Sequence, residues 1–299
     1  MELLTLEEFF QTAQTKKSKR IAIAAAQDPP VLKAIQKAFH ERIIEPVLIG
    51  DSDQIKRMSE SINFSLENIE VVHDPDPVSS CSKAVDIIRN GEADILMKGM
   101  VPTAPLLKAI LDKKKGIRKR DMLSHFAFME MPGYHKLLGI TDAAMSIKPG
   151  LKDKISIILN AVEVFHRLGK MNPKVAVLGP IEMVNDSIES TVHAGQIKLL
   201  NQQGKINGCI IDGPLALDIA VSKQAAEHKK IEGDVAGDAD LLLAPDLNSG
   251  NILYKSMIFL GGATSASIIM GASVPVVLTS RSDSDQSKLM SIALAAALE

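Results

Sequence analysis

Short apolar runs alternate with longer amphipathic stretches along most of the chain. The runs end in Gly, Asp or Pro, which is typical of buried strands. They form two series, the first at 20–26, 45–50, 69–73, 93–99 and 123–131, and the second at 174–179, 208–213, 239–245 and 274–280. Strands that alternate with helices indicate a mainly parallel sheet with helical crossovers. Both series therefore predict an α/β fold.

The stretches between these runs have helical periodicity. In "DKISIILNAVEVFHRLG", residues 153–169, apolar side chains recur every three or four positions and Gly169 is a natural stop. Some strand candidates, such as "DLLLA" and "VPVVL", are apolar at every position. Continuous apolar runs are typical of parallel strands buried on both faces. We therefore expect helices to cover both faces of the sheets.

A chain of 299 residues is long enough for two domains. Residues 132–150, "PGYHKLLGITDAAMSIKPG", carry two Pro and three Gly between the two strand series and predict a boundary. We expect a first α/β domain over 1–138 and a second over 139–284. The strongly helical C-terminal segment, 285–299, is expected to pack back on the first domain.

Composition narrows the class of protein. Hydrophobic residues make up 46% and charged residues 23%, and the formal net charge is −2. This balance predicts no general affinity for nucleic acid or for an anionic membrane surface. The basic run 113–120, "KKKGIRKR", is interpreted as a solvated helix end and loop, with contact to a phosphate-rich ligand as the alternative.

Cysteine usage and the N-terminal segment indicate a cytoplasmic protein. Cys81 and Cys209 have neither a disulfide nor a metal-ligand spacing, so we expect no disulfide framework and no metal site. The start, "MELLTLEEFFQTAQ", reads as an amphipathic helix rather than a signal peptide. No apolar run reaches the length of about 18 residues that a membrane span requires.

Candidate site residues follow the strand candidates. In open α/β sheets, ligands bind beyond the carboxyl ends of the strands. The segments at these positions are 98–103, 212–214, 245–251 and 280–285. Arg281 beside a helix N-terminus is a common way to hold a phosphate group.

Each of these segments also has a structural interpretation, and the residues alone leave both open. Asp246, Asn248 and Asn251 are favoured in turns and helix caps, and any residue of 282–285 could cap the last helix. Several signatures are absent, namely G-x-x-x-x-G-K-[ST], G-x-G-x-x-G, H-E-x-x-H and G-x-S-x-G. Their absence disfavours nucleotide hydrolysis, hydride transfer and serine hydrolysis.

Six stretches in sequence order resemble one family, the phosphate acetyl/butyryltransferases, and within it the phosphate butyryltransferase branch. They are "DILMKGMVPTAPLLKAIL", "LSHFAFMEMPGYHKLLGITDAAM", "KVAVLGPIEMVN", "IDGPLALDIAVS", "VAGDADLLLAPDLNSGNILYKS" and "VVLTSRSDSDQSKLMSIALA". The resemblance implies reversible transfer of an acyl group between coenzyme A and inorganic phosphate. It also implies two α/β domains with the active site in the cleft between them. It further implies a homodimer or larger homo-oligomer, and no cofactor, since coenzyme A and phosphate are substrates.

The resemblance also implies roles for single residues. Arg281 would hold phosphate or the acyl phosphate, and Ser280 would hydrogen-bond the reacting thioester. Ser287 stands where the acetyltransferase branch has an Asp that is the proposed base, so Asp283 and Asp285 are the candidate bases here.

The same resemblance predicts a set of substrate-binding residues. Lys98 and Thr103 fit the butyryl branch, with Lys98 as a phosphate contact. Lys108 stands where acetyltransferases usually have an Arg. The complete predicted substrate-binding set is Lys98, Thr103, Lys108, Asp246, Asn248, Gly250 and Ser287.

The resemblance leaves the substrate and the activity open to alternatives. We expect direct attack of phosphate on the thioester in a ternary complex. A covalent intermediate is less favoured, although Cys209 is close to the "DGP" segment. The alternatives are acetyl or broad short-chain specificity and, in a different class, a non-catalytic acyl-CoA sensor.

Overall fold

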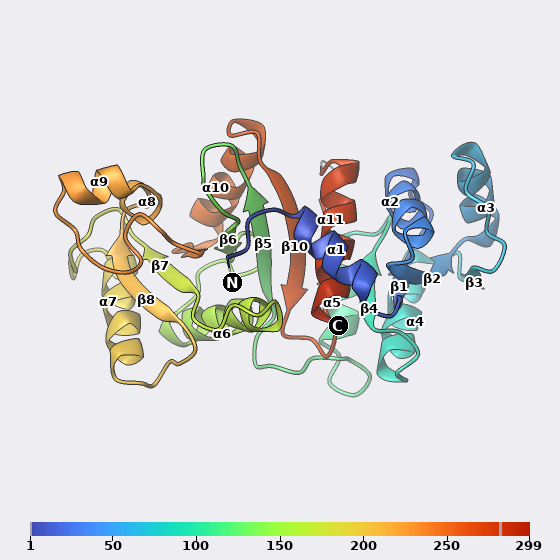
Figure 1. Cartoon of the computed structure of the whole chain (residues 1–299). Helices are drawn as coiled ribbons and strands as arrows, with labels where there is room; N and C mark the ends of the chain where they lie inside the picture. Colours follow the sequence, from blue (N-terminus) through green and yellow to red (C-terminus); the bar gives the residue numbers. More distant parts are fainter. Residues whose placement is uncertain (1, 281–282) are drawn as a thin grey trace. The chain divides into compact units, whose positions relative to one another are not determined.

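A computed structural model describes residues 2–280 and 283–299 of the chain. Its contacts divide the chain into two compact units, and each unit contains several of the predicted strands (Figure 1). Unit 1 comprises the N-terminal residues up to Thr5 together with Met122–Ser265, and unit 2 comprises Leu6–Asp121 and Ala266–Glu299. None of the helices in the described part of the chain is both long and apolar enough to cross a membrane.

Unit 2 is built on a mainly parallel sheet in the order β3-β2-β1-β4-β11-β10. Its strands are β1 (Lys19–Ala24), β2 (Ile44–Gly50), β3 (Glu70–His73), β4 (Ile95–Lys98), β10 (Thr264–Met270, most of which lies in unit 2) and β11 (Val276–Val277). Its helices are α1 (Glu7–Thr15), α2 (Pro29–His40), α3 (Ser52–Ser61), α4 (Pro77–Arg89), α5 (Thr103–Ile110) and α11 (Asp285–Leu298). The antiparallel pair is β10 with β11.

The crossovers place helices on both faces of this sheet. The steps β1-α2-β2 and β2-α3-β3 run in one direction, and β3-α4-β4 returns past β1. Because such crossovers are right-handed, α4 lies on the face opposite α2 and α3. Helix α11 packs on α1 and α2, and α5 packs on α4, so each face has its own layer (Figure 1).

Unit 1 is built on a second sheet in the order β5-β6-β9-β7-β8. Its strands are β5 (Ser124–Glu130), β6 (Leu138–Thr141), β7 (Lys174–Leu178), β8 (Ile210–Leu215) and β9 (Leu241–Leu243). Its helices are α6 (Leu151–Arg167), α7 (Glu189–Gln202), α8 (Leu217–Val221), α9 (Lys223–His228) and α10 (Leu247–Phe259). The pairs β6–β9, β9–β7 and β7–β8 are parallel, and β5–β6 is antiparallel. The predicted α/β fold class is confirmed.

Local sequence explains where the helices begin. Asp76 accepts hydrogen bonds from the backbone N–H groups of Val78 and Ser79 at 3.1 and 3.2 Å, and Pro77 occupies the first position of α4. Helix α2 likewise begins with Pro29 and Pro30. Proline suits this place because the first helical N–H groups have no partner within the helix.

Two strands, β6 and β10, were not predicted from the sequence. Strand β6 has only four residues, includes Gly139 and lies inside the segment 132–150 that was interpreted as a boundary. Strand β10 contains Ser265 and Ser267, which interrupt the apolar pattern although both are buried. The Ser265 hydroxyl lies 3.1 Å from the Tyr254 hydroxyl of α10, and the Ser291 hydroxyl of α11 accepts a hydrogen bond from the Ser267 N–H at 2.8 Å, so polar groups of this strand have tertiary partners.

The boundaries of the two compact units differ from the domain boundaries predicted at 138/139 and 284/285. The chain passes from unit 2 to unit 1 at 121/122 and returns at 265/266. Strands β5 and β6 share a ladder and β6 pairs with β9, so the predicted boundary segment is an internal part of unit 1. The C-terminal helix packs on α1 and α2 of unit 2.

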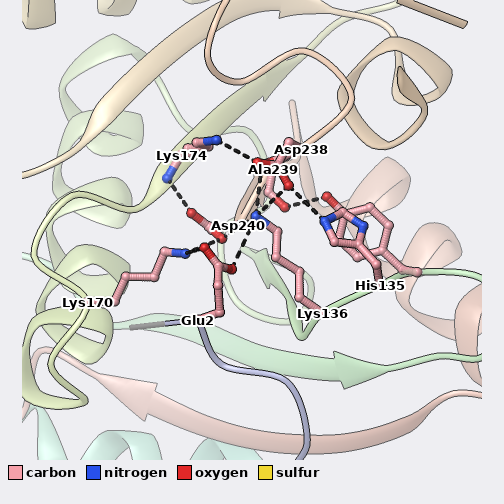
Figure 2. Close-up of polar contacts among 9 residues, drawn as sticks. Glu2, His135, Lys136, Lys170, Lys174, Asp238, Ala239 and Asp240 are labelled. Carbon is pink, nitrogen blue, oxygen red and sulfur yellow. Dashed lines mark hydrogen bonds and ion pairs between the residues drawn. The ribbon is translucent and has the colours of Figure 1, made fainter. Parts of the chain in front are cut away.

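An ion-pair network closes the amino edge of the unit 1 sheet (Figure 2). The Lys136 side chain is only 2% exposed, and its Nζ lies 2.7 Å from Asp240 Oδ1 and 2.9 Å from Asp238 Oδ1. Asp240 also pairs with Lys170 at 2.8 Å and accepts a hydrogen bond from the Lys174 N–H at 2.8 Å. These residues lie just before or at the start of β6, β9 and β7, so the network ties three neighbouring strands together.

The N-terminal segment joins the same network. Glu2 Oε1 lies 3.2 Å from Lys170 Nζ, and the Leu3 carbonyl accepts a hydrogen bond from the Leu137 N–H at 2.9 Å. Partial burial opposes ionisation of Asp238. Hydrogen bonds from Lys174, Lys136 and His135 outweigh that cost and hold the pKa of this carboxyl well below its usual range.

We predict that Lys136→Met lowers the free energy of unfolding by about 3 kcal/mol, because Asp240 loses a buried counter-charge. Urea unfolding followed by circular dichroism measures this. Lys148→Met is the matched control, since Lys148 is 77% exposed and its pair with Glu189 lies on the surface. The control is expected to change stability by no more than about 0.5 kcal/mol. Equal losses in the two variants would contradict the role of the network.

A second prediction concerns pH. Because the pKa of Asp238 is lower in the folded state, its contribution is complete above the unfolded pKa of about 3.9 and is lost as the pH falls towards the folded value. The stability difference between the wild type and Asp238→Asn should be constant from pH 5 to 7 and smaller by about 1 kcal/mol at pH 3. Urea titrations of both proteins at each pH measure the difference. A constant difference over the whole range would show that Asp238 does not titrate as described.

Candidate functional site

Three neighbouring parallel strands of unit 2 end at the same edge of the sheet. They are β1, β4 and β11, with β4 in the middle. From β1 the chain continues towards β2 and β3 on one side, and β4 lies on the other side, so the pair β1–β4 is a topological switch point. Open α/β sheets bind their ligands in the crevice beyond such a point.

A pocket of about 240 Å³ lies at this edge. It is lined by Asp28, Pro29, Pro30, Val31, Lys98, Gly99, Met100, Thr279, Ser280 and Lys288. These residues follow β1, β4 and β11 or lie in the first turns of α2 and α11. The structure therefore places two sequence-predicted site residues, Lys98 and Ser280, in the lining of one pocket.

Lys98 is the last residue of β4 and is 7% exposed. Its Nζ atom donates to the carbonyl oxygens of Gly99 and Val101 at 3.0 and 3.1 Å. Gly99 is required here, because a Cβ atom would lie 2.2 Å from the Ala25 carbonyl oxygen. The close approach of the chain after β4 to the chain after β1 holds the ammonium group at the pocket.

Lys288 is a second buried cation in the lining, and the sequence analysis missed it. It lies in the first turn of α11, is 3% exposed, and its Nζ donates to the carbonyl oxygen of Asp283. A signal was present in the sequence, since Lys288 is the only charged residue of the otherwise apolar segment "SKLMSIALAAAL". Two ammonium groups bound to carbonyl oxygens make the pocket suitable for an anion.

Two hydrogen bonds join Ser280, which follows β11, to Asp283. The Ser280 N–H donates to Asp283 Oδ2 at 2.7 Å, and the Asp283 N–H donates to the Ser280 carbonyl at 3.2 Å. This reciprocal pair fixes Ser280, the first residue of the predicted Ser-Arg motif, relative to Asp283. Arg281 itself lies outside the described residues, as does Ser282.

The start of α11 identifies the capping residue. Ser284 is the N-cap and accepts a hydrogen bond from the Ser287 N–H at 3.0 Å. Ser287 is buried outside the pocket lining, and its carbonyl accepts from the Ser291 hydroxyl at 2.7 Å. Asp285 is the exposed first residue of the helix. Ser287 and Ser284 thus have structural contacts, and the catalytic role of Asp285 stays a prediction.

Thr103 and Lys108 lie on α5, which begins shortly after β4. Neither residue lines the pocket with Lys98. Lys108 lies in the last turn and lines another pocket of about 250 Å³, together with residues such as Asp86, Asp112 and Lys115. The structure therefore separates Lys108 from Lys98, and the basic run 113–120 lies beyond the end of α5.

The remaining predicted residues belong to unit 1, at the carboxyl end of β9. Asp246 caps α10, accepting from the Ser249 N–H and hydroxyl, each at 2.9 Å, and these hydrogen bonds lower the pKa of its carboxyl. A Cβ atom on Gly250 would lie 2.5 Å from the Asp142 carbonyl oxygen. Asn248 is exposed in the first turn. Capping and close packing account for Asp246 and Gly250, and substrate contacts by the three residues stay predictions.

Both cysteines are buried and free. Burial raises the pKa of the Cys81 and Cys209 thiols to about 11. A thiol is nucleophilic as the thiolate, so these side chains are unreactive near neutral pH. Neither cysteine lines the pocket that contains Lys98 and Ser280.

Comparisons with known proteins agree with this architecture. The chain is 41% identical over 292 residues to a phosphate butyryltransferase of Clostridium acetobutylicum, covering 98% of this chain and 97% of that protein. It is 43% identical over 291 residues to a phosphate acetyltransferase of Thermotoga maritima, covering 97% of this chain and 98% of that one.

A solved structure is similar over almost the same length. It is a branched-chain phosphotransacylase from Enterococcus faecalis, with a TM-score of 0.82, 34% identity, and coverage of 94% of this chain and 98% of that one. A family model described as phosphate acetyl/butaryl transferase matches residues 4–78 and 77–296. Sequence and fold thus agree, and the chain belongs to the phosphate acetyl/butyryltransferase family.

Proposed function

We propose that this protein transfers a short-chain acyl group, butyryl in the first instance, between coenzyme A and inorganic phosphate. The products are the acyl phosphate and free coenzyme A. The observation that carries the proposal is the pocket with two buried lysines and Ser280 at the switch point of unit 2, in a chain that belongs to this family over nearly its whole length.

The reaction is a direct displacement. A phosphate oxygen attacks the thioester carbonyl, a carbon–oxygen bond forms, and the carbon–sulfur bond breaks as the thiolate leaves and takes a proton. Holding both substrates together lowers the barrier by roughly 7 to 11 kcal/mol when they are well oriented. The unreactive cysteines support direct attack over a covalent enzyme intermediate.

The pocket residues have distinct proposed roles. Lys98 and Lys288 attract the phosphate and offset its negative charge. The family resemblance implies that Arg281, outside the described residues, would add a forked donor pair. The Ser280 hydroxyl donates to the thioester or the departing sulfur. Asp283, which accepts the Ser280 N–H, orients Ser280 and stays with Asp285 as a candidate base for the thiol in the reverse direction. The proposal needs no cofactor, and the protein is expected to act as a homodimer or larger homo-oligomer.

Acyl preference is the first quantity to measure. Sequence identity does not decide it, because relatives named for butyryl and for acetyl transfer are about equally similar to this chain. Free thiol released from butyryl-CoA and acetyl-CoA is followed with and without phosphate. We expect phosphate-dependent release and a kcat/KM about tenfold higher for butyryl-CoA, given that each methylene contributes roughly 1 to 3 kcal/mol.

The other outcomes have distinct meanings. A preference for acetyl-CoA would keep the reaction and change the substrate. Release that is absent with both thioesters, in a protein that binds coenzyme A, would overturn the transferase and favour an acyl-CoA sensor.

A second prediction tests the pocket. Lys98→Met should lower kcat/KM for phosphate about 100-fold, because it removes a charge-assisted contact to the reacting anion. Lys33→Met is the matched control, since Lys33 is an exposed residue of α2. Steady-state kinetics on folded variants provides the comparison, and the control should retain activity within about twofold.

Lys108→Met distinguishes the Lys108 pocket from the Lys98 pocket. Loss of activity in Lys108→Met with full activity in Lys98→Met would move the anion site to the pocket of Asp112 and Lys115. Near-normal activity of both variants would remove both lysines from the reaction.

A further inference from the structure

A buried lysine whose hydrogen-bond partner is an imidazole lies in unit 1. Lys154 of α6 is 3% exposed, and its Nζ lies 3.2 Å from Nδ1 of the half-buried His193 in α7. No sequence pattern joined these residues, which are 39 positions apart. A hydrogen bond to an imidazole leaves two of the three donors of the ammonium group for other acceptors.

The surroundings of Lys154 favour negative charge. Lys154 is the fourth residue of α6, His193 is the fifth of α7, and Asp246 caps α10. These helices begin after β6, β7 and β9, which are parallel neighbours, so their N-termini lie at the carboxyl edge of one sheet. Helix N-termini carry partial positive charge, which disfavours a buried cation and attracts an anion.

The nearby carboxylates are engaged elsewhere. Glu189 pairs with Lys148 at 3.3 Å, Asp246 accepts two hydrogen bonds from Ser249, and Asp153 accepts the Gly150 N–H at 2.9 Å. Among the residues that the structure describes, no carboxylate lies within ion-pair distance of the Lys154 ammonium. The buried charge therefore has its closest polar partner in a neutral ring.

The charges around the pair act on both of its members. Burial lowers the pKa of Lys154, Glu189 and Asp246 oppose this from longer range, and Lys148 adds to it. Burial and the charge of Lys154 lower the pKa of His193, so the imidazole stays neutral near pH 7. When Nδ1 accepts from Lys154, the ring proton is on Nε2, which gives the pair a second donor.

We propose that Lys154 and His193 form a phosphoryl-binding site at the carboxyl edge of the unit 1 sheet. This inference rests on the proposed function, which supplies two sources of phosphoryl oxygens, inorganic phosphate and the phosphates of coenzyme A. The ligand oxygens accept from the Lys154 ammonium, which the His193 ring holds in place through Nδ1. The site belongs to unit 1 and uses none of the residues that line the Lys98 pocket.

The test begins with the wild-type protein, so that it does not depend on a variant. The imidazole signals of His193 are followed by NMR during titration with inorganic phosphate, with coenzyme A, and with pantetheine, which carries no phosphoryl group. His193→Gln assigns the signals. We expect a saturable shift with phosphate or coenzyme A and none with pantetheine.

Variants then test the lysine. Lys154→Met should weaken binding of the active probe about tenfold or more, as expected for a charge-assisted hydrogen bond. Lys148→Met, which removes an exposed lysine beside the same helices, should bind within about twofold of the wild type. If Lys154→Met does not fold, Lys154→Arg provides the comparison, with His193 signals that still move on titration.

The outcomes distinguish the source of the phosphoryl group, and they separate this binding site from the proposed acyl-transfer function. If the His193 signals shift with inorganic phosphate, the ligand is the free anion. If they shift with coenzyme A alone, the ligand is a phosphate group of the coenzyme. Either result supports the site. The site is overturned if His193 signals stay fixed with all three probes, or if Lys154→Met binds like the wild type. Acyl transfer is assayed separately, so an active enzyme with fixed His193 signals loses only the site. An inactive protein whose His193 signals respond loses only the proposed function.

Discussion

The burial of lysine ammonium groups is the constraint on which the edges of both sheets depend. An ammonium group removed from water is costly unless charges or hydrogen bonds replace its hydration. Lys136 meets this requirement with Asp238 and Asp240, and the same carboxylates link β6, β9 and β7 at their amino ends (Figure 2). The network therefore has a structural role at the amino edge of the unit 1 sheet.

At the carboxyl edges of the sheets, the buried lysines have different hydrogen-bond partners. Lys98 and Lys288 donate to carbonyl oxygens, and Lys154 donates to an imidazole. A carbonyl oxygen or an imidazole supplies a hydrogen bond without adding a negative charge. Parallel strands bring these groups together because all of them end at one edge, where the following helices also begin. In the proposed reaction, inorganic phosphate is consumed and an acyl phosphate is formed, and both are anions. Sheet edges with buried lysines suit ligands of this charge.

Strands with a local apolar signal were predicted from the sequence, and strands that depend on distant partners were missed. Continuous apolar runs identified most strands, because a strand buried on both faces cannot carry polar side chains without partners. Strand β10 was missed because its buried polar groups have partners in other elements, the Ser265 hydroxyl with Tyr254 of α10 and the Ser267 N–H with Ser291 of α11. The predicted boundary at 132–150 contains β6, whose pairing with β9 joins segments about a hundred residues apart. Loop composition could not reveal a partner at that distance.

The sequence by itself determined the α/β class, the family, and the presence of Lys98 and Ser280 after their strands, since these follow from local periodicity and ordered motifs. Only the tertiary structure decided which of the candidates share a pocket. It joined Lys288 to Lys98, separated Lys108 from both, and brought Lys154 against His193. It also decided between cap and ligand for Ser284, through the hydrogen bond from Ser287. The reason is physical, because strand order and helix packing set distances between side chains, and strand order in a sheet is not the order along the chain.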